Sequence, residues 1–233
     1  MSRITRKELK SDKFAQDLGL TVSFFEEHRK EVVRYAGIAL AVIALIVGYS
    51  VYRRHERNAR EHELALAIAI QESPVSANGA AGPNSFPNQS SKDAAAIKAF
   101  SDLQSKYSGT DEGEIAEYYV GSILADAGKL ADSEKHFLQV SQKAGVHYAS
   151  LAKLALAQIY YADGRNEQGD QILRDLMAHP TIFVSKDEAT ITLARQLAGR
   201  NPAEARKLLG PIKDGTGPVA TMAQMLYSEL PPQ

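Results

Sequence analysis

The sequence predicts an all-α protein with a single N-terminal transmembrane helix followed by an α-solenoid of short paired helices. Three observations carry this prediction. The run from Ala36 to Tyr52 contains no charged residue. Beyond residue 91 the chain reads as short helical segments separated by glycine and proline. In that region, small and large residues recur at steps of 36 or 37 positions, which is typical of stacked repeats.

Composition excludes several classes of function. The chain has 233 residues, 44% of them apolar and 24% charged, which is ordinary for a folded protein. The net charge of -1 provides no global field that would attract nucleic acid, so we expect no nucleic-acid partner. The absence of cysteine rules out disulfides, thiolate metal sites and a cysteine nucleophile, but it fits a reducing cytosol and a periplasm equally well.

The uncharged run predicts a transmembrane helix over residues 35–53. At ~1.5 Å per residue, Ala36 to Tyr52 spans about 25 Å, at the short end of the range for a bilayer core. Basic clusters flank the run at His28-Arg29-Lys30 and Arg53-Arg54-His55, which favours an anchor over a buried core helix. A cleaved signal peptide is disfavoured, because the run ends in a tyrosine and two arginines rather than in small residues.

Residues 1–34 form a short basic arm, which we expect to be cytoplasmic. The arm carries eight Lys and Arg, whereas a long C-terminal domain can cross a membrane largely regardless of its charge. Local charge counts on the two sides of the span do not decide the orientation. Within the arm, Phe14, Leu18, Val22 and Phe25 share one helical face, which indicates either an amphipathic helix on the membrane surface or a partly ordered basic arm.

After the span, residues 54–72 are predicted to continue the anchor helix, and residues 73–91 to form a flexible linker. The linker holds three prolines, five serines and no charge. Residues 92–230 are predicted to form the repeat domain, with only 181–184 resembling a strand. Its expected helices are 93–107, 114–127, 132–144, 148–162, 168–178, 186–198, 202–212 and 218–230. Most end at glycine, which suits the left-handed geometry of a helix C-terminus.

The repeats are visible as a small residue followed four positions later by a large one. The pairs are Ala96 and Phe100, Ser133 and Phe137, Gly169 and Leu173, and Ala205 and Leu209. The segments Gly121-x2-Leu124-x3-Gly128 and Ala157-x2-Tyr160-x3-Gly164 also repeat the same offsets. This pattern resembles the tetratricopeptide repeat, in which small residues let two antiparallel helices approach closely. Glu117 and Lys153 occupy the usual tryptophan position, so the repeats are degenerate, and an irregular helical bundle is the alternative.

The order of basic arm, anchor helix and degenerate tetratricopeptide repeats resembles the YfgM-type ancillary subunits of the bacterial SecYEG translocon. The resemblance covers nearly the whole chain. It implies a single-pass protein of the bacterial inner membrane, with a cytoplasmic N-terminus and a periplasmic C-terminal domain. It also implies contact with translocon subunits, or the handing of emerging proteins to periplasmic chaperones. It transfers no functional residue to this sequence.

The sequence gives no support to an enzyme. The nucleophile elbow G-x-S-x-G, the phosphate loop G-x4-G-K-[ST], the dinucleotide turn G-x-G-x2-G and the zinc motif H-E-x2-H are all absent. Among the six histidines only His55 and His62 share a helix face, and no carboxylate joins them at metal-binding spacing. We therefore expect no catalytic residue, no cofactor, no bound metal and no small-molecule substrate.

The remaining candidate is a groove for a protein partner, lined by the first helices of neighbouring repeats. Helical spacing assigns to it Tyr118, Ser122 and Asp126 from one repeat and Leu154, Gln158 and Tyr161 from the next. Tyrosines suit peptide recognition because their rings give contact area at low entropy cost. The alternative is that Tyr118 and Tyr161 are half-buried packing residues beside two core wedges, Tyr119 and Tyr160.

Two functions follow from this arrangement. The first is a membrane-anchored adaptor that binds other cell-envelope proteins through the groove. The second is a structural scaffold or self-assembling subunit of another envelope complex, in which the C-terminal helix 218–230 fills the groove.

Overall fold

The computed structural model describes residues 29–76 and 85–231, and within these ranges every regular element is a helix. The helices are α2 (Arg29–Glu72), α3 (Gln89–Lys106), α4 (Asp111–Asp126), α5 (Leu130–Lys143), α6 (Val146–Ala162), α7 (Asn166–Ala178), α8 (Lys186–Leu197), α9 (Pro202–Lys213) and α10 (Pro218–Glu229). The chain divides into two compact units, residues 1–59 and 60–233. The all-α prediction is confirmed. The amphipathic pattern of residues 14–25 and the middle of the linker, 77–84, lie outside the described residues.

Helix α2 contains both the predicted span and the predicted continuation without a break. It is 44 residues long. From Val33 to Tyr52 its large apolar side chains are 49% to 73% exposed, and none of them belongs to a core. Its most apolar stretch has a mean hydropathy of 2.0 and is 0% buried, so by length and composition α2 can cross a membrane. The C-terminal part of α2 has a different role, because Leu64 and Ala67 are buried.

The residues Leu64 and Ala67 share a core with Ala96 and Phe100 of α3 and with Val120 of α4. The end of α2 and α3 therefore form the first helix pair of the repeat domain. Its two helices are separated in sequence by the linker. The described ends of that linker are joined by two backbone hydrogen bonds, from Ser76 N–H to the Phe86 carbonyl at 2.8 Å and from Phe86 N–H to the Pro74 carbonyl at 3.0 Å.

A buried ion pair adds to this first pair. Arg60 of α2 donates from Nε to Oε2 of Glu112 in α4 at 2.8 Å, and the two side chains are only 17% and 8% exposed. Burial is the largest influence on Glu112 and opposes its charged form. The hydrogen bonds from Arg60, the backbone and Thr110, together with the Arg60 charge, outweigh burial, so the pKa of this carboxyl lies below its ordinary value. A buried carboxylate that lost its partner would be costly, so the pair fixes how the end of α2 meets α4.

Helix α3 begins at Gln89, four residues before the expected start. Asn88 has an extended backbone (φ -158°, ψ 167°), and its side chain accepts a hydrogen bond from Ser91 N–H at 2.8 Å. This is an N-cap, which satisfies one of the free amides of the first turn. The polar run Asn88 to Ser91 therefore belongs to the start of a helix rather than to the linker.

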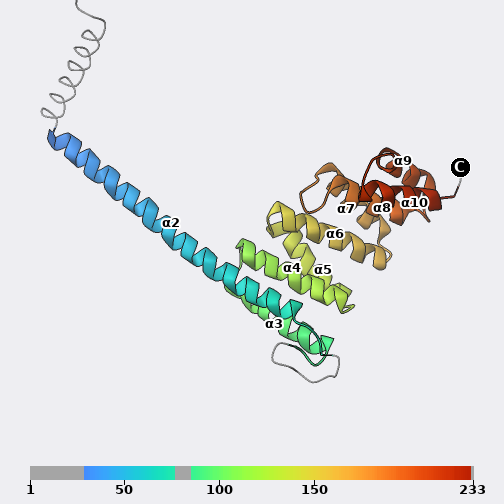
Figure 1. Cartoon of the computed structure of the whole chain (residues 1–233), viewed down its shortest axis with the longest axis horizontal. Coiled ribbons are helices and arrows are strands. Elements are labelled where there is room, and N and C mark those ends of the chain that lie inside the picture. The colour runs from blue at the N-terminus through green and yellow to red at the C-terminus, as the bar shows by residue number, and fades with distance from the viewer. Residues whose placement is uncertain (1–28, 77–84, 232–233) are drawn as a thin grey trace, which may run out of the picture. The chain divides into compact units, whose positions relative to one another are not determined.

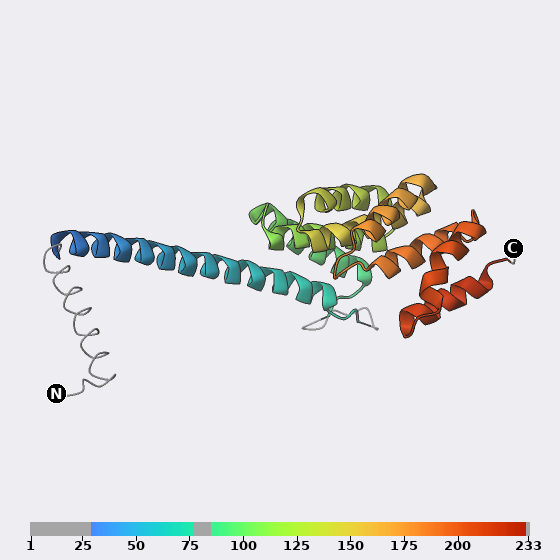
Figure 2. The same ribbon diagram turned by 90° about the horizontal axis from the view of Figure 1, so that it is seen from above.

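Each helix of the repeat domain packs mainly against the next one along the chain (Figure 1), with α4 also meeting α6 and α8 also meeting α10. The helices run as antiparallel hairpins, which the turned view in Figure 2 also shows. Contacts between sequence neighbours are the defining property of a solenoid. The predicted small residues all lie at the helix crossings: Ala96, Ser133, Gly169 and Ala205 are buried, and so are the large residues four positions later, Phe100, Phe137, Leu173 and Leu209.

Geometry explains why these positions are small. A Cβ atom added to Gly169 would lie 2.7 Å from Cζ of Tyr161, and one added to Gly121 would lie 3.0 Å from Cε1 of Phe137. Ser133 is also buried at such a crossing. Its hydroxyl donates to the Gly121 carbonyl at 2.7 Å, so this polar group is not left unpaired. The predicted close approach of paired helices is confirmed at these positions.

Some of the glycine helix ends have the expected geometry, whereas Gly145 and the segment 181–184 differ from expectation. Gly128 and Gly164 have φ of 74° and 73°, the left-handed conformation expected after a helix. Gly145 instead has φ -55° and is the N-cap of α6, because α6 starts immediately after α5 ends. The strand-like segment 181–184 is a turn, in which the Thr181 hydroxyl accepts from the N–H of Val184 at 3.0 Å. The side chain of Val184 is buried, which accounts for the apolar pattern.

The substitution Gly169→Ala tests the close approach. The new methyl would force the Tyr161 ring to move, so we expect a loss of about 1–3 kcal/mol of stability, the usual range for overpacking. The matched control is Gly199→Ala, because Gly199 is exposed and a Cβ there would meet nothing within 4 Å. Thermal unfolding of the full chain in detergent micelles, followed by circular dichroism, measures both. Equal unfolding temperatures for the two variants would contradict the explanation.

Candidate partner-binding groove

A groove of about 390 Å³ lies between α4, α5 and α6. Four of the six residues assigned from the sequence line it: Tyr118, Ser122 and Asp126 from α4 and Gln158 from α6. Asp126 and Gln158 are exposed, whereas Tyr118 and Ser122 are half-buried. The floor is apolar, with side chains from all three helices.

The other two assigned residues, Leu154 and Tyr161, do not line this groove. Leu154 is half-buried against the core formed by α6 to α10. The ring of Tyr161 covers Gly169 of α7, and its hydroxyl donates to Oδ1 of Asp170 at 2.7 Å. Burial, together with that hydrogen bond, raises the pKa of Tyr161. Tyr161 is therefore a packing residue of the α6–α7 hairpin, as the alternative interpretation allowed. Gly169 leaves the space that the ring occupies.

Tyr118 combines packing with exposure to the groove. Its ring centroid lies 5.5 Å from those of Phe137 and Tyr148, with the Tyr148 ring edge-on. Burial raises the pKa of Tyr118, so its phenol is neutral at physiological pH. Among the described residues no hydrogen bond from its hydroxyl is found, so this group remains available to a ligand at the groove wall.

Sequence reasoning missed an aromatic row that crosses this face. Phe100 stacks on Tyr119 at 4.7 Å between ring centroids, Tyr118 meets Tyr148, and Tyr148 meets Phe183 edge-on at 5.6 Å. The only sequence signal for Phe183 was the apolar run 181–184, which resembled a strand. The row links α3, α4, α6 and the turn before α8. Edge-to-face pairs of this kind favour one arrangement of the groove wall.

The chemistry of the groove suits binding rather than catalysis. Ser122, Gln158 and the Tyr118 hydroxyl offer neutral hydrogen-bonding groups, and Asp126 is the one carboxylate among the lining residues. In the described ranges, no group of three or more His, Cys, Asp or Glu side chains converges as metal ligands would. Such a groove can hold an apolar side chain and hydrogen-bond the peptide around it.

The C-terminal helix does not occupy this groove. Helix α10 packs against α9 and α8, and its Ala223 lies in the core that contains Leu197 and Leu209. The idea that residues 218–230 fill the groove of their own chain is therefore wrong. The helix instead covers the apolar end of the last hairpin, because Ala220 and Ala223 face that core and are buried.

Paired antiparallel helices, sequential packing and a groove between repeats define an α-solenoid of the protein-interaction class. The chain belongs to the tetratricopeptide repeat-like domain family, whose model matches residues 23–211. A comparison with curated protein sequences found no match. Two solved structures are similar: a Podosopora anserina protein described as a kinesin light chain with nearly identical TPR-like repeats, and a single-substitution variant of it. Each has a TM-score of 0.54 and 13% identity, covering 73% of this chain and 84% of the other. At that identity the likeness shows the fold alone.

Two substitutions at Tyr118 separate packing from hydrogen bonding. Tyr118→Ala removes a ring that contacts Tyr119, Phe137 and Tyr148, so we expect a loss of about 2–4 kcal/mol of stability. Tyr118→Phe keeps the ring and removes only the hydroxyl, so we expect a change within about 0.5 kcal/mol. Urea unfolding of the full chain in micelles measures both. A large loss with phenylalanine would mean that the hydroxyl has a structural role.

Proposed function

We propose that this protein is a membrane-anchored adaptor that binds other cell-envelope proteins through the groove between α4 and α6. The carrying observation is that α2 from Val33 to Tyr52 exposes its large apolar side chains, whereas most of those in the repeat domain lie in its buried cores. Such a continuous apolar surface is unfavourable in water and suits a lipid bilayer. Membership of the tetratricopeptide repeat-like family supports the interaction role.

The partners that we propose are subunits of the protein translocon or periplasmic chaperones. The support is the order of segments, in which a basic arm precedes one apolar helix and a tetratricopeptide-like domain, as in the YfgM-type subunits. The proposed location is the bacterial inner membrane, with the repeat domain in the periplasm. A small, mostly neutral groove favours weak binding, and anchoring compensates because it raises the effective concentration of the domain near membrane partners.

Cysteine labelling tests the orientation without interference, because the natural chain has no cysteine. We expect Lys129→Cys, an exposed position in the repeat domain, to react with a membrane-impermeant maleimide in intact spheroplasts. Ser11→Cys, in the basic arm, should react only after lysis. The reverse pattern would place the repeat domain in the cytoplasm and would remove the periplasmic proposal.

Photo-crosslinking tests the partner and the groove together. A benzoylphenylalanine at position 158, in the groove, should crosslink translocon subunits or chaperones in native membranes, identified by mass spectrometry. The matched control is position 171, since Gln171 is also an exposed helical glutamine but does not line the groove. We expect no equivalent crosslink from position 171. The same products from both positions, or none from position 158, would contradict binding at this groove.

A further inference from the structure

A second groove of the repeat domain lies at its C-terminal end. It has a volume of about 900 Å³ and is lined by α7, α8, α9, the turn after α9 and the first turn of α10. It shares no residue with the groove between α4 and α6. Its volume lies within the range of about 300–1,000 Å³ that is usual for ligand sites.

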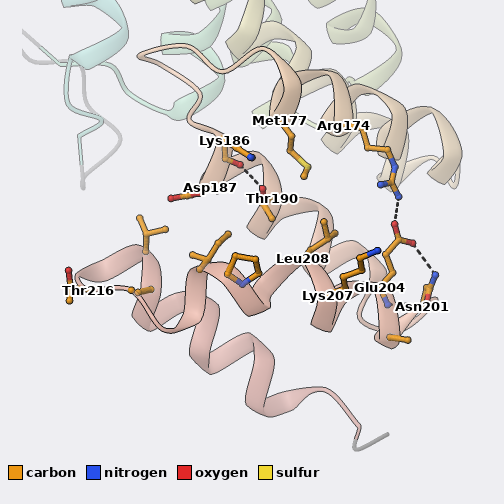
Figure 3. A pocket seen from close by; sticks show the side chains of 16 residues that line it. Arg174, Met177, Lys186, Asp187, Thr190, Asn201, Glu204, Lys207, Leu208 and Thr216 are labelled. Carbon is orange, nitrogen blue, oxygen red and sulfur yellow. Dashed lines mark hydrogen bonds and ion pairs between the residues drawn. The ribbon is translucent and has the colours of Figure 1, made fainter.

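The middle of this groove is apolar. Met177, Leu208 and Ile212 are half-buried along it, and Val219 of α10 is 44% exposed at its edge. In Figure 3, Met177 and Leu208 lie between Lys186 and Lys207. An apolar centre flanked by charged side chains matches a ligand that carries both apolar and charged groups.

Some charged side chains around the groove form ion pairs within the protein, and others do not. Nη2 of Arg174 donates to Oε1 of Glu204, and Asn201 donates to the other oxygen of the same carboxylate at 3.0 Å (Figure 3). The Glu204 charge is therefore already balanced. Lys186 and Lys207 are exposed, and no ion pair to either is found in the described parts of the chain. The one other carboxylate of the groove, Asp187, lies in the first turn of α8, where the helix dipole favours it.

The start of α10 adds to this positive character. Its N-cap is Gly217, with φ 94°, and no side chain caps the first turn. Val219 and Ala220 of that turn line the groove, so their helix end, with its free amides, borders it. This end of a helix carries a partial positive charge that attracts anions. The feature strengthens the attraction of the two lysines for a carboxylate.

We propose that the groove between α7, α8, α9 and α10 binds an acidic, apolar peptide segment of a partner protein. Apolar side chains of the peptide lie on Met177 and Leu208, and its carboxylates lie toward Lys186 and Lys207. This second surface is independent of the groove at α4 and α6, so the failure of one leaves the other standing.

Methionine methyl signals locate the binding directly. The chain has four methionines, of which Met177 lines the groove, whereas Met222 and Met225 of α10 do not. The probe is a capped ten-residue peptide of leucine, glutamate and serine, added to the full chain in nanodiscs with ¹³C-labelled methionine methyls. We expect the Met177 signal to shift while the signals of Met222 and Met225 stay in place. A peptide with lysine for glutamate, and one with serine for leucine, should leave Met177 unshifted.

Charge reversal gives the quantitative arm of the experiment. The double variant Lys186→Glu with Lys207→Glu should weaken the peptide affinity by about tenfold, which corresponds to about 1.4 kcal/mol. The control, Lys129→Glu with Lys143→Glu, makes the same change in net charge at two exposed lysines outside the groove, and we expect less than a twofold change. The proposal is overturned by an unshifted Met177 signal, by an equal response to the lysine peptide, or by equal weakening in the two double variants.

Discussion

The close approach of paired helices at Ala96, Ser133, Gly169 and Ala205 is the constraint on which the repeat domain depends. All four positions are buried, and at Gly169 a Cβ atom would lie only 2.7 Å from the Tyr161 ring of the partner helix. Because the constraint recurs every 36 or 37 residues, every hairpin meets the next in a similar way. The walls of both grooves are made of these hairpins, so groove geometry follows from core packing.

Where a residue departs from the usual repeat pattern, a polar side chain of the other helix in the hairpin contacts it. Glu117 takes the usual tryptophan position of α4 and is buried, and its Oε1 lies 3.0 Å from Nδ1 of His136 in α5. Lys153 takes the same position in α6, and its ammonium lies 2.6 Å from Oδ2 of Asp175 in α7. In both hairpins a polar contact replaces the apolar contact of a large aromatic ring. The buried Glu117 needs such a partner because an unpaired buried polar group is costly, whereas Lys153 and Asp175 meet at the surface of their hairpin.

The sequence predicted those features that depend on periodicity, and it missed those that depend on a particular contact. Spacing alone identified the helix crossings and placed Tyr118, Ser122, Asp126 and Gln158 on one face. It could not assign Tyr161, because the direction of that ring depends on the space left by Gly169 in the next helix. The start of α3 was misplaced because Asn88 and Ser91 are equally common in loops and N-caps. The α7–α10 groove could not be predicted from the sequence, because it is formed by four helices and no local sequence pattern specifies how they contact one another.

Helix α2 contains an exposed apolar run and, near its C-terminal end, residues buried in the core of the repeat domain. Eight positions after Tyr52, the last residue of the apolar run, Arg60 already contributes to the buried pair with Glu112, and Leu64 and Ala67 then enter the core. The C-terminal end of α2 is therefore the first helix of the first repeat. Without that helix, Phe100 and Val120 would lose apolar cover and Glu112 would lose its counter-charge, at a cost that buried ion pairs make large. The apolar run of α2 and the core of the first repeat are thus parts of one helix, joined through residues 60–67, so a version that lacks α2 would be less stable.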